Sequence, residues 1–116
     1  MIPSFQNLAS ISSILQMTKA LANEWAQYGI TVNAIGPGYC FTEMTRPLLS
    51  KPGVKDKYEE RIPMGRLGEP VEIARMMAFM VSDECSYLDG VDILYDGGVV
   101  AGLEVRATNE AMAKQD

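Results

Sequence analysis

The sequence predicts an α/β fold, because helix-like and strand-like patterns alternate along its 116 residues. Apolar residues recur at helical spacing near the N-terminus and again after residue 70. Each of these patterns is followed by a short run of strand-like composition. The two runs end in glycine-containing turns, at Gly36-Pro37-Gly38 and at Asp96-Gly97-Gly98. Helix, turn, strand and glycine loop together make an α/β unit.

The first helix is expected from Ser13 to Tyr28. Ser13 and Gln16 have the spacing of a capping box, which is typical of a helix N-terminus. Gly29 follows as a C-terminal stop. Apolar residues at three- and four-residue steps predict one buried stripe on this helix: Ile14, Met17, Leu21 and Trp25.

A strand is expected directly after this helix, from Ile30 to Ile35. The run is short and rich in β-branched residues, and glycine-containing breakers bound it on both sides. From Tyr39 to Arg66 the pattern weakens, since three prolines interrupt it: Pro47, Pro52 and Pro63. One charged helix, from about Val54 to Arg61, is expected within this loop-like segment.

A second clear helix is expected to begin at Glu69-Pro70. Proline is favoured in the first turn of a helix, and Glu72 lies near the positive end of the helix dipole. Four residues at helical spacing predict its buried stripe: Ile73, Met76, Met77 and Met80. The run from Val91 to Tyr95 is the second expected strand.

Composition excludes several classes of function. The net charge of -5, with ten basic and fifteen acidic side chains, argues against nucleic-acid binding. Histidine, the commonest metal ligand and general base, does not occur, so no metal site is expected. Cys40 and Cys85 have neither zinc-ligand spacing nor a secreted disulfide pattern. Without a signal-peptide pattern or a long apolar run, the expected location is the cytoplasm, with no membrane partner.

Several separated motifs resemble the C-terminal half of a short-chain dehydrogenase/reductase. The matching segments are residues 20–26 (ALANEWA), 28–38 (YGITVNAIGPG), 62–70 (IPMGRLGEP) and the turn 96–98 (DGG), with Thr42 completing a PGxxxT pattern. The resemblance covers about residues 8 to 102. Within the family, gluconate or 2-keto-3-deoxygluconate dehydrogenase-type reductases look nearest, because of residues 23–25 and 36–39.

The resemblance implies the C-terminal half of a Rossmann-like, doubly wound parallel sheet. The half is incomplete, since it contains only a helix, a strand, a loop, further helices and a last strand. Residues 1–103 are then a partial domain of this family. Residues 104–116 are polar and are expected to form a frayed or disordered tail.

The chemistry of the family is hydride transfer between a nicotinamide and an alcohol or ketone. A tyrosine in a YxxxK motif moves the hydroxyl proton, and the lysine lowers the pKa of that tyrosine. Counted back from residues 15–19, this motif falls on Asn7 and Ile11, whose side chains cannot do this work. In a second register, residues 7–13 match the end of the family's fifth strand, and the tyrosine segment is deleted. Under either register, no catalytic residue is expected.

The cofactor site implied by the resemblance is also incomplete. The glycine-rich turn that holds the pyrophosphate does not occur. By resemblance, four residues would line the nicotinamide ring and its carboxamide: Pro37, Gly38, Cys40 and Thr42. The cofactor would be NAD or NADP, and tight binding by this chain alone is not expected, because half a site offers too few contacts. Arg66 is expected to hold the substrate loop or to pair with an acidic side chain.

The sequence therefore predicts a fragment of an NAD(P)-dependent oxidoreductase that acts on an alcohol or ketone, for example a sugar acid, and is inactive alone. The alternative is a non-catalytic oligomerisation or regulatory partner of a full-length family member. Unpaired strand edges and exposed apolar faces favour association, including a homo-oligomer. Two further hypotheses are that a separate chain supplies the nucleotide-binding half, and that Met1 is not the natural start.

Overall fold

The computed structural model describes the backbone of residues 5–114 and the side chains of residues 12–103 and 110–114. The elements follow one another along the chain as α1 (Phe5–Trp25), η1 (Ala26–Tyr28), β1 (Ala34–Pro37), α2 (Arg46–Leu49), α3 (Val54–Glu59), α4 (Pro70–Met80), η2 (Asp83–Cys85), β2 (Asp92–Tyr95) and α5 (Val99–Ala113). This order confirms the predicted α/β class.

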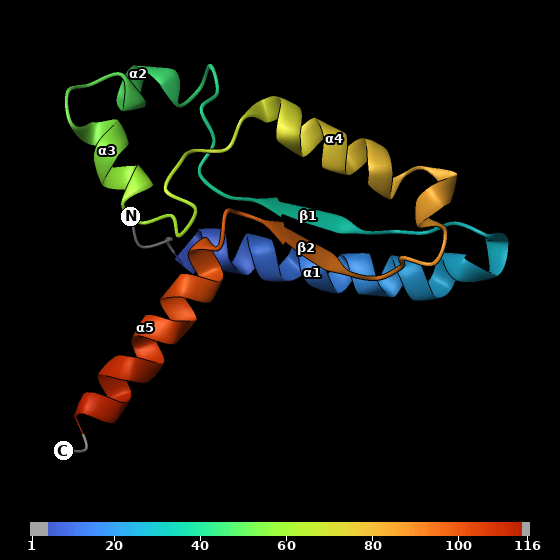
Figure 1. Cartoon of the computed structure of the whole chain (residues 1–116). Helices are drawn as coiled ribbons and strands as arrows, with labels where there is room; N and C mark the ends of the chain where they lie inside the picture. The colour runs from blue at the N-terminus through green and yellow to red at the C-terminus, as the bar shows by residue number, and fades with distance from the viewer. Residues whose placement is uncertain (1–4, 115–116) are drawn as a thin grey trace. The chain divides into compact units, whose positions relative to one another are not determined.

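The two strands pair in a parallel, two-stranded sheet (Figure 1). The N–H of Ala34 donates to the carbonyl of Val91 at 2.8 Å, and the N–H of Gly38 donates to the carbonyl of Tyr95 at 3.1 Å. In both bonds the acceptor residue lies the same number of positions after the donor residue along the chain, as a parallel register requires. Parallel strands need a long crossover connection, and α2, α3 and α4 lie within it.

The chain divides into two compact units. Among the described residues, one unit comprises the chain up to Gly36 together with Arg75–Ile93. The other comprises Pro37–Ala74 and the chain from Leu94 onward. Each unit contains part of both strands, and the second contains every residue proposed above as a cofactor contact.

Helix α1 begins earlier than the sequence predicted. It starts at Phe5 instead of Ser13, and no proline or glycine interrupts residues 5–12. The α-helix itself ends at Trp25, but η1 continues the helical segment to the predicted end at Tyr28, and Gly29 follows in a left-handed conformation with φ of 73°. Residues 7–13 lie within the helix, which favours the register that puts Asn7 and Ile11 at the motif positions. The side chains of these two residues lie outside the described part.

The predicted buried stripe of α1 is largely wrong, since only Leu21 is half-buried and Ile14, Met17 and Trp25 are exposed. Ile14 and Met17 are 51% and 57% exposed, whereas Thr18 and Ala22 are only 6% and 4% exposed. Small side chains face the interior of this unit because the backbone approaches closely there: a Cβ built on Gly90 would lie 3.3 Å from the Cβ of Ala22. The spacing of apolar residues in α1 identified an apolar face of the helix, but it did not predict which face is buried in the first unit.

Strand β1 is shifted relative to its predicted range, and begins at Ala34 instead of Ile30. The two residues before it are held by side-chain hydrogen bonds instead of a strand ladder. The N–H of Val32 donates to Oδ1 of Asp89 at 2.8 Å, and Nδ2 of Asn33 donates to the carbonyl of Leu88 at 2.9 Å. Together with one backbone bond, from the N–H of Gly90 to the carbonyl of Val32 at 2.9 Å, these side-chain bonds take the place of the regular strand ladder that was expected here.

The second unit has its own apolar core. Leu49, Ile62 and Leu67 are buried, and half-buried residues pack against them: Tyr39, Phe41, Val54, Tyr58 and Val99. Helix α3 confirms the helix expected near Val54. Helix α2 was not predicted, since it is only one turn long and contains Pro47.

Helix α4 and strand β2 confirm the predictions made for them. Pro70 is the first residue of α4, and Glu72 lies in its first turn. Of the predicted stripe, Met80 is buried, Ile73 and Met76 are half-buried, and Met77 is exposed. The stripe is therefore partly correct.

Helix α5 runs through most of the segment expected to be frayed. The carboxylate of Asp96 caps its first turn, accepting hydrogen bonds from the N–H of Gly98 at 2.9 Å and of Val100 at 3.0 Å. The helix rests on a proline ring, because a Cβ on Gly98 or Gly102 would lie only 3.2 or 3.1 Å from Pro63. Whether residues 104–116 stand apart from the domain stays a prediction.

In the described part of the chain, no helix is both long enough and apolar enough to cross a bilayer. The same residues contain no cluster of three His, Cys, Asp or Glu side chains arranged to hold a metal ion.

Truncating the core of the second unit should destabilise the fold. Leu49 is 6% exposed and Leu48, beside it in α2, is 42% exposed. Leu49→Ala should lower the free energy of unfolding by about 2–3 kcal/mol, since it removes a buried side chain from a small core. The matched control Leu48→Ala should change it by less than about 0.5 kcal/mol. Urea unfolding followed by circular dichroism measures both, and equal effects would contradict this description of the core.

Candidate functional site

The loop that follows β1 carries the four residues proposed by resemblance. Pro37 is the exposed last residue of β1. Gly38 comes next, and a Cβ at this position would lie 2.7 Å from the Cα of Asp96. Glycine is therefore required where the ends of the two strands approach each other, whether or not a ligand is bound.

A backbone bridge fixes the next part of the loop. Cys40 and Gly68 form an isolated parallel bridge. The N–H of Phe41 donates to the carbonyl of Gly68 at 3.0 Å, and the N–H of Gly68 donates to the carbonyl of Tyr39 at 2.9 Å. A Cβ on Gly68 would lie 3.1 Å from the Sγ of Cys40, so the two segments meet at close range.

Two threonines close the loop on itself. The hydroxyl of Thr45 donates to the carbonyl of Cys40 at 2.8 Å. The same oxygen accepts a hydrogen bond from the N–H of Thr42 at 2.8 Å. The two hydroxyl oxygens are 3.2 Å apart. Thr45 thus joins Cys40 to Thr42, the two proposed cofactor contacts that carry hydrogen-bonding groups.

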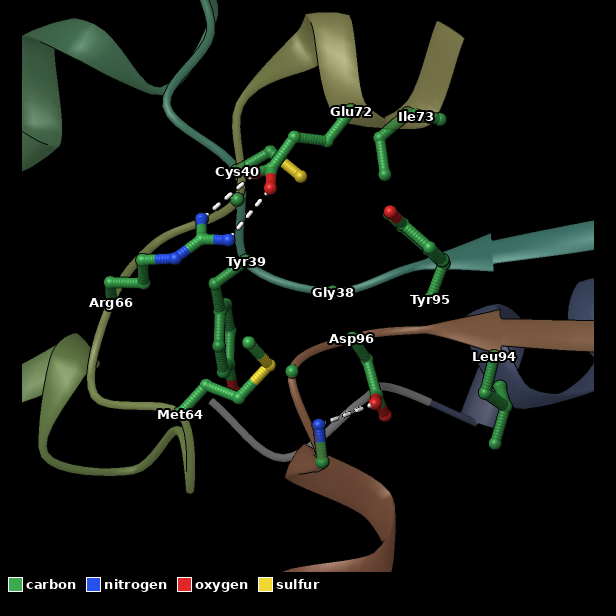
Figure 2. Close-up of a pocket in the computed structure, with 13 residues that line it drawn as sticks. Gly38, Tyr39, Cys40, Met64, Arg66, Glu72, Ile73, Leu94, Tyr95 and Asp96 are labelled. Carbon is green, nitrogen blue, oxygen red and sulfur yellow. Dashed lines mark hydrogen bonds and ion pairs between the residues drawn. The ribbon is translucent and has the colours of Figure 1, made fainter. Parts of the chain in front are cut away.

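Arg66 forms a two-pronged ion pair with Glu72 (Figure 2). Its two terminal nitrogens lie 2.8 and 2.6 Å from the two carboxylate oxygens. Glu72 also accepts the N–H of Glu69 at 2.9 Å, at the start of α4. Hydrogen bonding to Glu72 and its charge raise the pKa of Arg66 above its ordinary value. Of the two roles predicted for Arg66, the structure therefore shows pairing with an acidic side chain.

A cavity of about 430 Å3 lies between these groups in the second unit. Gly38, Tyr39 and Cys40 line it from the loop, with Arg66 and Glu72 on the opposite segment (Figure 2). Met64, Ile73, Leu94 and Tyr95 make part of its wall apolar. Pro37 and Thr42 are not among its lining residues, so the cavity includes only two of the four proposed contacts.

Cys40 has a thiol that resists ionisation. Burial raises its pKa, and the negative charge of Glu72 raises it further. A cysteine nucleophile needs the opposite environment, one that stabilises the thiolate. Cys40 is therefore suited to packing and to backbone hydrogen bonding.

The sequence analysis anticipated Thr42 and Arg66 but missed the roles of Thr45 and Gly68, and it placed Glu72 at the start of a helix without predicting its pairing with Arg66. A threonine three residues after Thr42, at the start of a short helix, was the available signal for Thr45. The acidic residue three positions after Glu69 was the signal for Glu72, because an acid there reaches back to the helix N-terminus.

Comparison with known proteins identifies the family to which this chain belongs. The chain matches the family model described as Enoyl-(Acyl carrier protein) reductase over residues 8–100. A short chain dehydrogenase family protein from Francisella tularensis subsp. tularensis SCHU S4 is 34% identical with a TM-score of 0.80, over 87% of this chain and 46% of that one. The chain belongs to the short-chain dehydrogenase/reductase family.

Individual relatives differ in their reactions. Galactitol 2-dehydrogenase (L-tagatose-forming) of Cereibacter sphaeroides is 44% identical over 91 residues, 78% of this chain and 36% of the relative. Acetoacetyl-CoA reductase of Shinella zoogloeoides is 51% identical over 84 residues, 72% of this chain and 34% of the relative. The chain therefore spans little more than a third of the length of these curated relatives.

One solved relative contains a nicotinamide cofactor. A putative 2-deoxy-D-gluconate 3-dehydrogenase from Agrobacterium tumefaciens, with bound NADP, is 41% identical with a TM-score of 0.74. The match covers 80% of this chain and 38% of that one. This relative supports the predicted likeness to sugar-acid dehydrogenases.

The reactivity of Cys40 should report the charge on Glu72. Iodoacetamide reacts with the thiolate, so Cys40 should react more slowly at about pH 8 in the folded chain than in the urea-unfolded chain. Glu72→Gln removes the nearby negative charge and should raise the folded-state rate by about twofold to fivefold. Peptide mass spectrometry measures the modified fraction. Glu69→Gln is the matched control, and an equal rise there would refute the role of Glu72.

Proposed function

We propose that this chain supplies the nicotinamide end of an NAD(P) site in a short-chain dehydrogenase/reductase and does not catalyse the reaction alone. The observation that carries the proposal is the hydrogen-bonding pattern of residues 38–45. Thr45 and Gly68 hold this loop in one conformation. A loop that is ordered before binding loses less conformational entropy when a ligand arrives.

The groups on this loop fit a carboxamide. Among the described residues, none accepts a hydrogen bond from the N–H of Cys40, so this donor is open to a ligand carbonyl. The hydroxyl oxygen of Thr42 has acceptor capacity for a ligand N–H. One donor and one acceptor, two residues apart, match the two hydrogen-bonding sides of a primary amide. Pro37 and Gly38 would lie against the ring itself.

The roles of these residues would be binding and orientation. NAD(P), when bound, exchanges a hydride with a carbon atom of the substrate. Cys40 and Thr42 would fix the rotation of the carboxamide, and with it the ring face that meets the substrate. Neither Asn7 nor Ile11 carries a group that titrates usefully, so neither residue could carry out the proton step.

The proposed substrate class is an alcohol or its ketone, with a polyhydroxylated sugar acid as the first choice. This choice rests on the relatives named for 2-deoxy-D-gluconate and 2-dehydro-3-deoxy-D-gluconate, whereas galactitol, named for another relative, is a sugar alcohol. The acetoacetyl-CoA reductase is more similar in sequence to this chain, and its name indicates a ketone substrate that is not a sugar. An alcohol or ketone is therefore the broader proposal, and a sugar acid is the narrower one.

Nicotinamide mononucleotide tests the cofactor proposal with binding alone. Amide signals of Gly38, Cys40 and Thr42 should shift in 15N-labelled protein during a titration with this ligand. Thr42→Val should weaken binding by about threefold to tenfold, since one hydrogen bond is lost. Thr31→Val is the matched control at an exposed threonine and should leave the affinity unchanged. If no loop amide shifts at millimolar ligand, the proposal is wrong.

A second proposed role is association, either as a homo-oligomer or with a full-length family member. The observation behind it is the exposed apolar face of α1, which includes Ile14 and Met17 together with Trp25. Apolar side chains that repeat along one helix face are typical of an interface. This role does not exclude the first, because the loop at residues 38–45 lies on other elements.

Changing this face should weaken self-association. Met17→Glu places a charge in the apolar face and should raise the dissociation constant by roughly tenfold or more. Asn23→Glu adds the same charge on the opposite, polar side of the helix and should have little effect. Sedimentation equilibrium measures both variants. A monomeric wild-type chain, or equal effects of the two variants, would contradict self-association.

A further inference from the structure

The side chain of Thr45 makes more hydrogen bonds than any other hydroxyl in this loop. Its oxygen lies 2.8 Å from the carbonyl oxygen of Cys40 and 2.8 Å from the amide nitrogen of Thr42. It also lies 3.2 Å from the hydroxyl oxygen of Thr42 and, more distantly, 3.3 Å from the carbonyl of that residue. This one hydroxyl group therefore links Thr45 to both Cys40 and Thr42, in addition to the backbone bond from the N–H of Thr45 to the carbonyl of Thr42 at 3.1 Å.

Counting hydrogens assigns a direction to each of these bonds. A threonine hydroxyl has one hydrogen to donate and two lone pairs that accept. The hydrogen of Thr45 goes to the carbonyl of Cys40, its closest acceptor. One lone pair accepts the N–H of Thr42. The second lone pair remains, so the contact between the two hydroxyls has Thr42 as the donor.

The hydroxyl of Thr42 is then left with acceptor capacity only. Its single hydrogen points to Thr45, and its oxygen lies 3.3 Å from the N–H of Thr45, a long contact that leaves a lone pair open. The carbonyl of Cys40 is occupied by Thr45 as well. Near these residues the loop can therefore present to a ligand the N–H of Cys40 as a donor and the hydroxyl oxygen of Thr42 as an acceptor.

We propose that Thr45 is a positioning residue that fixes the hydroxyl of Thr42 as an acceptor, so that the site selects a carboxamide N–H over a group with only a carbonyl. The inference rests on the proposed function and adds a source of selectivity to it. Thr45 itself need not touch the ligand. Without Thr45, the hydroxyl of Thr42 would rotate freely and would donate to a carbonyl as readily as it accepts from an amide.

The first test needs no ligand. Thr45→Val keeps the shape of the side chain but removes the oxygen that accepts the N–H of Thr42. Amide hydrogen exchange at Thr42, measured by NMR, should become about threefold to tenfold faster in this variant. Thr45→Ser keeps the hydroxyl and should keep the wild-type exchange rate. Unchanged exchange in Thr45→Val would overturn the inference.

The second test compares two ligands that differ in one group. Nicotinamide mononucleotide has a carboxamide, and 3-acetylpyridine mononucleotide has the same carbonyl with a methyl group in place of the NH2 and no added charge. The wild-type chain should bind the carboxamide about threefold to tenfold more tightly, as one hydrogen bond predicts. Thr45→Val should reduce this ratio to below about twofold, and Thr45→Ser should preserve it.

The outcomes separate this inference from the function on which it rests. Binding of both ligands at the loop with equal affinity in the wild type overturns the inference and leaves the proposed function standing. A preference that survives Thr45→Val unchanged also overturns the inference. No loop shift with either ligand overturns the proposed function and this inference together. Where the valine variant does not fold, equal binding of the two ligands by the wild type still overturns the inference, and Thr45→Ala, which also lacks the hydroxyl, replaces Thr45→Val in both tests.

Discussion

The backbone bridge between Cys40 and Gly68 is the constraint on which the second unit depends. It ties the loop after β1 to the segment before α4 through two hydrogen bonds of 3.0 and 2.9 Å. That segment is itself held by Arg66 and Glu72, which reach across the start of the helix. A residue with a side chain at position 68 would meet the sulfur of Cys40. One small residue therefore connects the ion pair to the candidate cofactor loop.

Local sequence patterns predicted the elements whose signals come from neighbouring residues. Helix α4 begins at the expected proline, β2 lies where β-branched and aromatic residues cluster, and Gly29 ends the first helical segment. The predictions failed where a distant residue decides the outcome. Gly90 lies against Ala22 on the buried face of α1, and Asp89 and Leu88 form hydrogen bonds with the two residues before β1. These contacts join residues that are far apart in the sequence, so the pattern of neighbouring residues does not predict them.

The candidate site was predictable to a similar extent. Thr42 was found through a motif, and Arg66 through its place in a second motif. The partners that fix them were not found, because hydrogen-bond direction and close backbone approach depend on three-dimensional geometry. Family likeness supplied the chemical expectation, and the hydrogen bonds of Thr45 supplied the reason for a defined orientation. Motifs therefore predict which residues the site contains, and the three-dimensional structure shows which partners hold those residues in place.

The contact between Pro63 and the start of α5 has a consequence for how this helix responds to its surroundings. Two glycines, Gly98 and Gly102, lie against a proline ring that has neither charge nor a hydrogen-bond donor. Ionic strength hardly weakens a contact of this kind, since there is no electrostatic attraction to screen. A single added carbon at either glycine, in contrast, would lie only 3.2 or 3.1 Å from the proline ring and would require that ring to shift. The contact between Pro63 and α5 is therefore insensitive to ionic strength but sensitive to substitution of either glycine.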